Sequence, residues 1–101
     1  MSYMLIIDPA ANLDMMESIR WYNGQKPGVG RRYYNSVKKS MKLIKSSPSM
    51  FQLRYKTLRM VPVEKFPFLV FYQIDEDKKL VAVAAVLHTS RNPKIWEQRT
   101  P

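Results

Sequence analysis

The sequence predicts an α+β domain with the element order β-α-α-β-β-β, in which a helical hairpin packs on one face of a small, mostly antiparallel sheet. Two stretches with helical spacing of apolar residues follow a short apolar run, and a glycine-containing turn separates them. Two further apolar runs enclose a polar turn near the C-terminus, which is the pattern of a β-hairpin. A hairpin of helices needs a second layer over its apolar face, and these strands supply it. The length of 101 residues fits one domain, spanning residues 1–101.

The first strand is expected at Tyr3–Ile7, a continuous apolar run typical of a strand buried on both faces. It ends at Asp8-Pro9, where Asp is a favoured N-cap and Pro is favoured at the first helical position. We therefore expect a helix from Pro9 to Asn23, ended by Asn23-Gly24. The core side of this helix is predicted to carry Leu13, Met16, Ile19 and Tyr22.

The second helix is expected at Val29–Ser46, after the turn QKPGVG. The two glycines of that turn are only a weak sign of a phosphate loop, because the rest of that fingerprint is missing. A stripe at helical spacing is predicted to face the core, and it consists of Tyr34, Val37, Met41 and Ile44. One residue further round the helix lies a basic ridge, made of Arg31, Lys38, Lys42 and Lys45.

The remaining strands are expected in the second half of the chain. The segment SSPSMFQ reads as a loop. A strand is predicted at Tyr55–Val63, and Pro62 makes it an edge or bulged strand because Pro cannot donate to a ladder. Two central strands, Phe68–Ile74 and Leu80–Leu87, enclose the turn Asp75–Lys79.

The C-terminal tail, Thr89–Pro101, is polar apart from Ile95 and Trp96. It is either a short docked helix or a mobile segment. The turn at residues 91–93 would dock it, with Trp96 packed on the sheet or on the first helix.

The charge of the chain is strongly positive. Seventeen Lys and Arg against eight Asp and Glu give a net charge of +9. No acidic residue occurs between Glu17 and Glu64. A field of one sign attracts a polyanion or an acidic protein, whereas charge that only confers solubility is usually mixed in sign. The basic residues inside this window are Arg20, Lys26, Arg31, Arg32, Lys38, Lys39, Lys42, Lys45, Arg54, Lys56 and Arg59.

Composition also excludes several classes of function. The chain contains no Cys, which rules out disulfides, thiolate catalysis and Cys-based zinc sites. One His and dispersed carboxylates do not make a metal site, and no cofactor motif is present. The longest apolar run, Leu80–Leu87, is too short to cross a bilayer. The N-terminus lacks the features of a signal peptide, so we expect a cytoplasmic protein without metal, cofactor or membrane contact.

The chain resembles the RelE/ParE family of type II toxin–antitoxin toxins in four stretches: WYNGQKPGVGRRYYNSV, SSPSMFQLRYKTLRM, KFPFLVFYQID and AAVLHTSRNPKIWEQR. The resemblance covers nearly the whole chain in the right order, and the set W-Y…P-G-x-G, F-P-(F/Y) and H-x-S-R-x-P is specific. It implies the fold predicted above and a toxin that arrests growth. It also implies a cognate antitoxin, usually acidic, which would lie over the basic ridge.

The resemblance leaves the mechanism open. RelE-like members cut mRNA in the ribosomal A site, whereas ParE-like members poison DNA gyrase and are not known to cut RNA. A shared fold cannot choose between these activities, because they differ in the site. A third reading is a degenerate member that is no longer toxic.

Ribonucleolytic relatives gather basic groups on the concave face of the sheet, because the anionic transition state needs fixed positive charge and groups that transfer protons. The resemblance implies His88 and Arg91 as catalytic residues if this chain is a ribonuclease. One departure favours the ParE-like branch: Leu69 stands close to where ribonucleolytic relatives carry an arginine. The candidates for nucleic-acid or target binding are Arg54, Lys56, Arg59, Tyr72 and Arg99.

Structural readings compete with these functional ones. A lone His at a strand end, such as His88, is more often structural than catalytic. Trp21 and Tyr22 fit the core or rim of the hairpin better than base stacking, and Tyr72 either stacks on a base or packs. The lysines of the basic ridge form either a solvated face or an antitoxin-facing surface.

Overall fold

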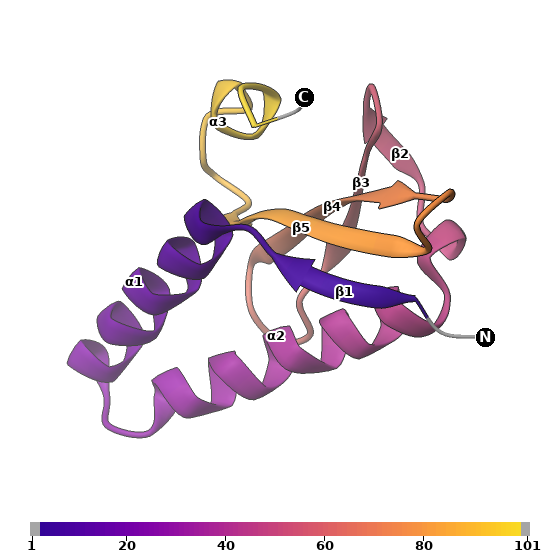
Figure 1. The fold of residues 1–101 in the computed structure, drawn as a ribbon. Helices are drawn as coiled ribbons and strands as arrows, with labels where there is room; N and C mark the ends of the chain where they lie inside the picture. The colour runs from indigo at the N-terminus through magenta and orange to yellow at the C-terminus, as the bar shows by residue number, and fades with distance from the viewer. Residues whose placement is uncertain (1–2, 100–101) are drawn as a thin grey trace.

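The computed structural model describes residues 3–99 and confirms the predicted α+β architecture (Figure 1). Helices α1 and α2 form a hairpin on one side of a five-stranded sheet, and the short helix α3 lies on the other side. Among the described residues no helix is both long and apolar enough to cross a membrane. The elements are β1 (Met4–Ile7), α1 (Pro9–Gln25), α2 (Val29–Ser46), the 3-10 turn η1 (Pro48–Met50), β2 (Leu53–Tyr55), β3 (Leu58–Pro62), β4 (Phe68–Asp75), β5 (Leu80–His88) and α3 (Lys94–Glu97).

The sheet is mixed, with the strand order β1-β5-β4-β3-β2. Strand β1 runs parallel to β5, with Met4 opposite Leu80 and Ile7 opposite Val83. All other pairs are antiparallel, so the predicted mostly antiparallel sheet is confirmed. Strands β4 and β5 each have a neighbour on both sides, as their continuous apolar sequences predicted.

The strand predicted at Tyr55–Val63 is wrong, because this segment forms parts of two strands. The chain turns at Lys56, whose φ is 50°, and β2 and β3 then pair with Tyr55 opposite Leu58. The turn contains no Gly, Asn or Pro, which are the usual signals of a hairpin. Pro62 lies beyond the residues that β2 pairs, so the outer side of β3 is free there, as a strand proline requires.

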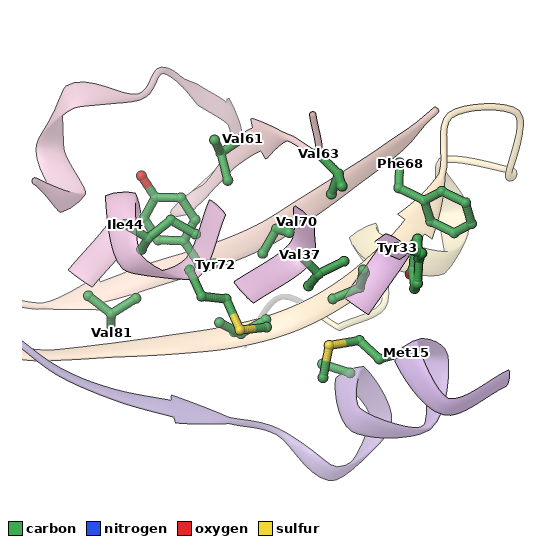
Figure 2. Packing of buried hydrophobic residues seen from close by; sticks show 14 residues of the cluster. Met15, Tyr33, Val37, Ile44, Val61, Val63, Phe68, Val70, Tyr72 and Val81 are labelled. Carbon is green, nitrogen blue, oxygen red and sulfur yellow. The ribbon is translucent and has the colours of Figure 1, made fainter. Parts of the chain in front are cut away.

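The core between helices and sheet is built mainly from α2 and the central strands (Figure 2). The predicted stripe residues Val37, Met41 and Ile44 are buried. The prediction that Tyr34 faces the core is wrong, because 38% of its surface is exposed. The neighbouring Tyr33 is fully buried in its place. Because these two tyrosines are adjacent, the spacing of apolar residues alone could not show which of them faces the core.

The predicted core face of α1 is also partly wrong. Leu13 is 58% exposed and Met16 is 45% exposed, whereas Ala11 and Met15 are buried. Ile19 and Tyr22, which were predicted correctly, pack against the core at its edge. Apolar residues lie all round this helix, so two faces had acceptable spacing. The face of α1 that carries the small Ala11 packs against the sheet. The face that carries Leu13 and Met16 is exposed to solvent. The helix also continues to Gln25, past the predicted end at Asn23-Gly24.

The two helices pack closely against each other at Gly30, near the start of α2. A Cβ atom there would lie 2.6 Å from the backbone oxygen of Ile19, so a larger residue would push the helices apart. The Gly30 N–H donates to Oδ1 of Asn23 across the hairpin, at 2.9 Å. The glycine therefore fixes the separation of α1 and α2.

A second apolar cluster lies on the opposite face of the sheet. Its buried members are Leu58, Phe71, Ala84, Ala85, Leu87 and Trp96. Trp96 comes from α3 and stacks on Phe71, with ring centroids 5.1 Å apart and planes 17° apart. Of the two expectations for the tail, the docked helix is therefore the one observed, and Trp96 packs on the sheet. The last two residues of the tail, 100–101, lie outside the described residues.

Candidate functional site

The structure does not gather the predicted basic residues into one cluster. His88 ends β5 on the side of the sheet that faces α1, and its ring packs edge-on against Phe68 with centroids 5.3 Å apart. The backbone N–H of Ser90 donates to Nδ1 of His88 at 3.0 Å, and the Ser90 hydroxyl lies 2.8 Å from the same nitrogen. A neutral His88 ring bonded in this way carries its proton on Nε2, which is left as a donor.

Arg91 follows His88 in a tight turn, where its N–H donates to the His88 carbonyl at 3.0 Å. Its side chain is exposed and makes no hydrogen bond or ion pair with the rest of residues 3–99. Asn92 closes the turn, because its Oδ1 accepts the N–H of Lys94 at 3.0 Å at the start of α3. The turn thus directs the tail onto the sheet, as the sequence predicted.

Arg54 and Lys56 lie at the β2 end of the sheet. The guanidinium of Arg54 lies 5.9 Å from the ring centroid of Trp96, and the ammonium of Lys56 lies 5.3 Å from that of Tyr55. Both side chains are exposed, and they contact aromatic rings by cation–π interactions. They are available to a partner but are not directed at His88.

Arg59 and Tyr72 lie on the helix-covered face, opposite each other on β3 and β4. Arg59 donates to the carbonyl of Phe51, and the Tyr72 hydroxyl donates to the carbonyl of Pro48 at 2.6 Å. Burial raises the pKa of Tyr72 to about 12, and the nearby Arg59 opposes that rise. Of the two readings of Tyr72, stacking on a base is wrong, because the ring is fully buried and packs in the core.

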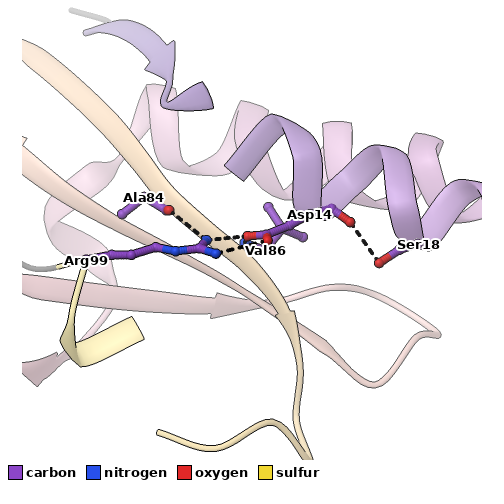
Figure 3. Close-up of polar contacts among 5 residues, drawn as sticks. All are labelled: Asp14, Ser18, Ala84, Val86 and Arg99. Carbon is purple, nitrogen blue, oxygen red and sulfur yellow. Dashed lines mark hydrogen bonds and ion pairs between the residues drawn. The ribbon is translucent and has the colours of Figure 1, made fainter. Parts of the chain in front are cut away.

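Arg99 holds the tail against α1 and the edge of β5 (Figure 3). Its Nη1 and Nη2 pair with the two carboxylate oxygens of Asp14, at 2.5 and 3.2 Å. Strand β1 ends at the level of Val83, and beyond it Asp14 accepts the N–H of Val86 while Arg99 donates to the carbonyl of Ala84. The predicted target-binding residue Arg99 therefore has a structural partner, which pattern analysis had no means to detect.

The basic ridge of α2 is fully presented to solvent. Its four residues are exposed, and the Lys38 ammonium lies 5.7 Å from the ring centroid of Tyr34. Among residues 3–99 the one ion pair of α2 joins Lys39 to Glu64, at 3.0 Å. This hydrogen-bonded ion pair lowers the pKa of Glu64. Within the described part of the chain, the ridge residues Arg31, Lys38, Lys42 and Lys45 form no ion pair.

A hollow of about 580 Å³ lies between the second half of α1 and the end of β5. Its walls are mostly apolar, and Trp21 in them is 60% exposed. The sequence pointed to His88 and named Trp21 and Tyr22, but it gave no reason to place them together with Pro67. The signals that could have found the hollow are an aromatic pair at a helix end and the F-P pair before β4. The hollow is lined by Glu17, Ser18, Trp21, Tyr22, Pro67, Phe68 and His88.

The face of the sheet opposite the helical hairpin has an apolar floor. Leu69 is part of it, packed against the cluster under Trp96. Of the predicted catalytic and binding residues, Arg54 and Lys56 place their cations over rings of this face, Trp96 and Tyr55 respectively. The described part of the chain also brings together no group of three or more His, Asp and Glu side chains that could hold a metal ion.

The structure thus combines a helical hairpin on a mixed sheet, a basic helix, and a tail docked on the second face. The model of the family described as "ParE toxin of type II toxin-antitoxin system, parDE" matches residues 5–93, so this chain belongs to that family. No curated protein sequence matches the chain.

Solved structures agree on the fold. The chromosomal ParDE toxin–antitoxin system from P. aeruginosa matches with a TM-score of 0.76 at 12% identity, covering 86% of this chain and 96% of that one. The isolated E. coli RelE toxin matches with a TM-score of 0.63 at 22% identity, covering 96% and 95%. The toxin–antitoxin complex RelBE2 from Mycobacterium tuberculosis matches with a TM-score of 0.60 at 15% identity, covering 87% and 99%.

Proposed function

We propose that this chain arrests growth as a ParE-like inhibitor that binds its target, DNA gyrase, in the cytoplasm and does not cut RNA. The observation that carries this proposal is the apolar floor of the sheet face opposite the helical hairpin. Cleavage of RNA needs cations fixed around a scissile phosphate and a group that transfers protons. Leu69 and the stacked rings of Phe71 and Trp96 occupy that face, and none of them can do either task.

The distribution of the basic residues supports the same proposal. His88 lies on the α1 side of the sheet, and Arg59 is directed at backbone carbonyls beside α2. Arg54 and Lys56 are held over aromatic rings at the far end of the sheet. Charges spread in this way suit the recognition of an extended surface on another macromolecule, which needs complementary potential rather than one reaction centre.

One observation favours the RelE-like alternative, a ribosome-dependent endoribonuclease. His88 and Arg91 share one turn, and the exposed Arg91 guanidinium forms no ion pair with the rest of residues 3–99. A proton-transferring group beside a free guanidinium is a minimal arrangement for phosphodiester chemistry. In that alternative, loss of either residue lowers cleavage by roughly 10²-fold or more.

The partner in either case is a cognate antitoxin, which we propose to be acidic and to cover the basic ridge of α2. The ridge offers four exposed cations that form no ion pair among residues 3–99, and neutralising them releases repulsion within a chain of charge +9. Binding of this kind weakens as salt rises.

The test is brief induction of the chain in a bacterium, followed by primer extension on a translated reporter mRNA and by a supercoiling assay with purified gyrase. Growth arrest with intact mRNA and inhibited gyrase is the expected result. Cleavage in translated codons that disappears in His88→Gln would replace the proposal by the RelE-like alternative. Unimpaired growth would identify a degenerate, non-toxic member.

A further inference from the structure

The hollow beside His88 combines apolar walls with one hydrogen-bond donor that has no partner among residues 3–99. Rings of Trp21, Tyr22 and Phe68 form most of its lining. This donor is Nε2 of His88, because Nδ1 already accepts from Ser90. A concave, mostly apolar site with a few convergent polar groups is the usual form of a binding pocket.

The buried ring of Tyr33 backs the aromatic wall of the hollow. The Tyr33 ring packs against Phe68 and Tyr22, with centroids 4.8 and 5.3 Å away. Its hydroxyl is buried, and it has no hydrogen-bond partner among residues 3–99. Burial raises the pKa of Tyr33 to about 12, and the Ser18 hydroxyl opposes that rise, so the phenol lies beside another wall residue.

The lining excludes a nucleic acid as the occupant. None of the seven lining residues is Lys or Arg, and the one acidic residue among them is Glu17. A carboxylate at the rim repels phosphate, and aromatic walls without cations favour an apolar group. A protein segment meets these conditions, because a bulky apolar side chain fills the hollow and its backbone carbonyl accepts a proton from His88.

The position of the hollow connects it to the basic ridge. Trp21 lies in the last part of α1 and Arg31 in the first turn of α2, and Figure 1 shows that these helix ends meet at the tip of the hairpin. Arg20 is exposed and directly precedes the wall residue Trp21, and Arg91 is exposed three residues after His88. A bound protein segment that leaves the hollow at Trp21 therefore enters the positive field along α2. Acidic residues next to the apolar side chain that fills the hollow would complement this field.

We infer that the hollow is the anchor site for a bulky apolar side chain of an acidic antitoxin segment, and that His88 holds the backbone of that segment. The inference rests on the proposed function in naming an antitoxin as the partner. It assigns His88 to neutralisation of the toxin and not to catalysis. Trp21, which is exposed in the free chain, becomes the main buried contact in the complex.

The experiment measures the affinity of the purified toxin for the antitoxin encoded beside its gene, and the growth arrest by each variant in cells. Trp21→Ala is expected to raise Kd at least about thirty-fold, as the loss of an aromatic anchor does. His88→Ala is expected to raise Kd about tenfold, and His88→Gln, which keeps an N–H donor, to stay within about threefold of wild type. Met50→Ala, an exposed apolar residue on η1, is the matched control and should bind like wild type.

Growth arrest separates this inference from the proposed function. Both Trp21→Ala and His88→Ala should still arrest growth, and the antitoxin should rescue cells from them poorly. Wild-type affinity in both variants overturns the inference, and so does a wild-type toxin that does not bind this antitoxin. Loss of growth arrest with unchanged affinity would assign the hollow to the target instead. A dimer of wild-type toxin that Trp21→Ala dissociates would assign it to a second copy of the chain. A wild-type chain that fails to arrest growth refutes the proposed function, while the affinities still decide the anchor site.

Discussion

Two helices cover one face of the sheet in this toxin, whereas a single helical turn covers part of the other face. The helix-covered face buries whole side chains from α2 and the central strands, such as Val37, Ile44 and Val70. The tail-covered face is closed by Trp96 and by the pair that Arg99 makes with Asp14. The first face therefore sets the stability of the fold, and the second is a local attachment that can differ among toxins of one fold.

The largest expected effect comes from the helix-covered face. Ile44→Ala should lower the free energy of unfolding by about 2–5 kcal/mol, because it leaves a cavity in a fully packed core. Leu43→Ala on the same helix is the control, and it should change stability by less than about 0.5 kcal/mol since Leu43 is exposed. Urea unfolding followed by circular dichroism measures both. Equal losses in the two variants would contradict the assignment of this face as the core.

A smaller effect is expected from the tail-covered face. Trp96→Ala should lower stability by about 2 kcal/mol, because the loss is limited to what docking of one helical turn contributes. Limited proteolysis should then remove the C-terminal tail while the remaining domain stays folded. Trp96→Phe, which keeps a ring on Phe71, should resist the protease like wild type. A global unfolding of Trp96→Ala as severe as that of Ile44→Ala would remove the distinction between the faces.

The difference between the faces also explains what the sequence predicted well. Strands β4 and β5 were clear because they are covered on both faces, so nearly every residue is apolar. The stripe with Val37 and Ile44 on α2 could be predicted because basic residues mark the neighbouring, exposed side of that helix. The sequence did not show which side of α1 faces the core, because this helix also carries apolar residues on its solvent-exposed side. The exposed Leu13 and Met16 belong to that side.

Contacts between distant segments account for most of what the sequence could not predict. Asp14 and Arg99 are 85 residues apart, and nothing local to either residue marks them as partners. The hollow joins α1, the F-P pair before β4 and the end of β5, so it exists only once the sheet has formed. Local patterns fix elements and their apolar faces, whereas a site assembled from three segments depends on strand register and helix phase.

The pair of Asp14 and Arg99 allows a sharper test of the tail-covered face. Asp14→Asn should lower stability by about 1–2 kcal/mol, since it leaves the partly buried guanidinium of Arg99 without its counter-charge. The Asn oxygen can still accept the N–H of Val86, so the edge of β5 keeps that bond. A double-mutant cycle with Arg99→Gln, followed by thermal unfolding, isolates the pair and should give a coupling of about 1 kcal/mol. A coupling near zero would show that Trp96 alone holds the tail.

The smallest expected effect is a gain in stability at the β2–β3 turn, which belongs to neither face. Lys56 has a φ of 50°, a left-handed conformation that L residues other than Asn and Asp adopt at a cost of about 1 kcal/mol. Lys56→Gly should therefore stabilise the chain by about 0.5–1 kcal/mol in thermal unfolding. Lys56→Ala keeps the strained backbone and loses the cation over Tyr55, so it should not stabilise. A Lys56→Gly variant that is more stable but arrests growth more weakly would show that the lysine contributes its charge at the target surface. Its strained backbone otherwise only lowers the stability of the fold.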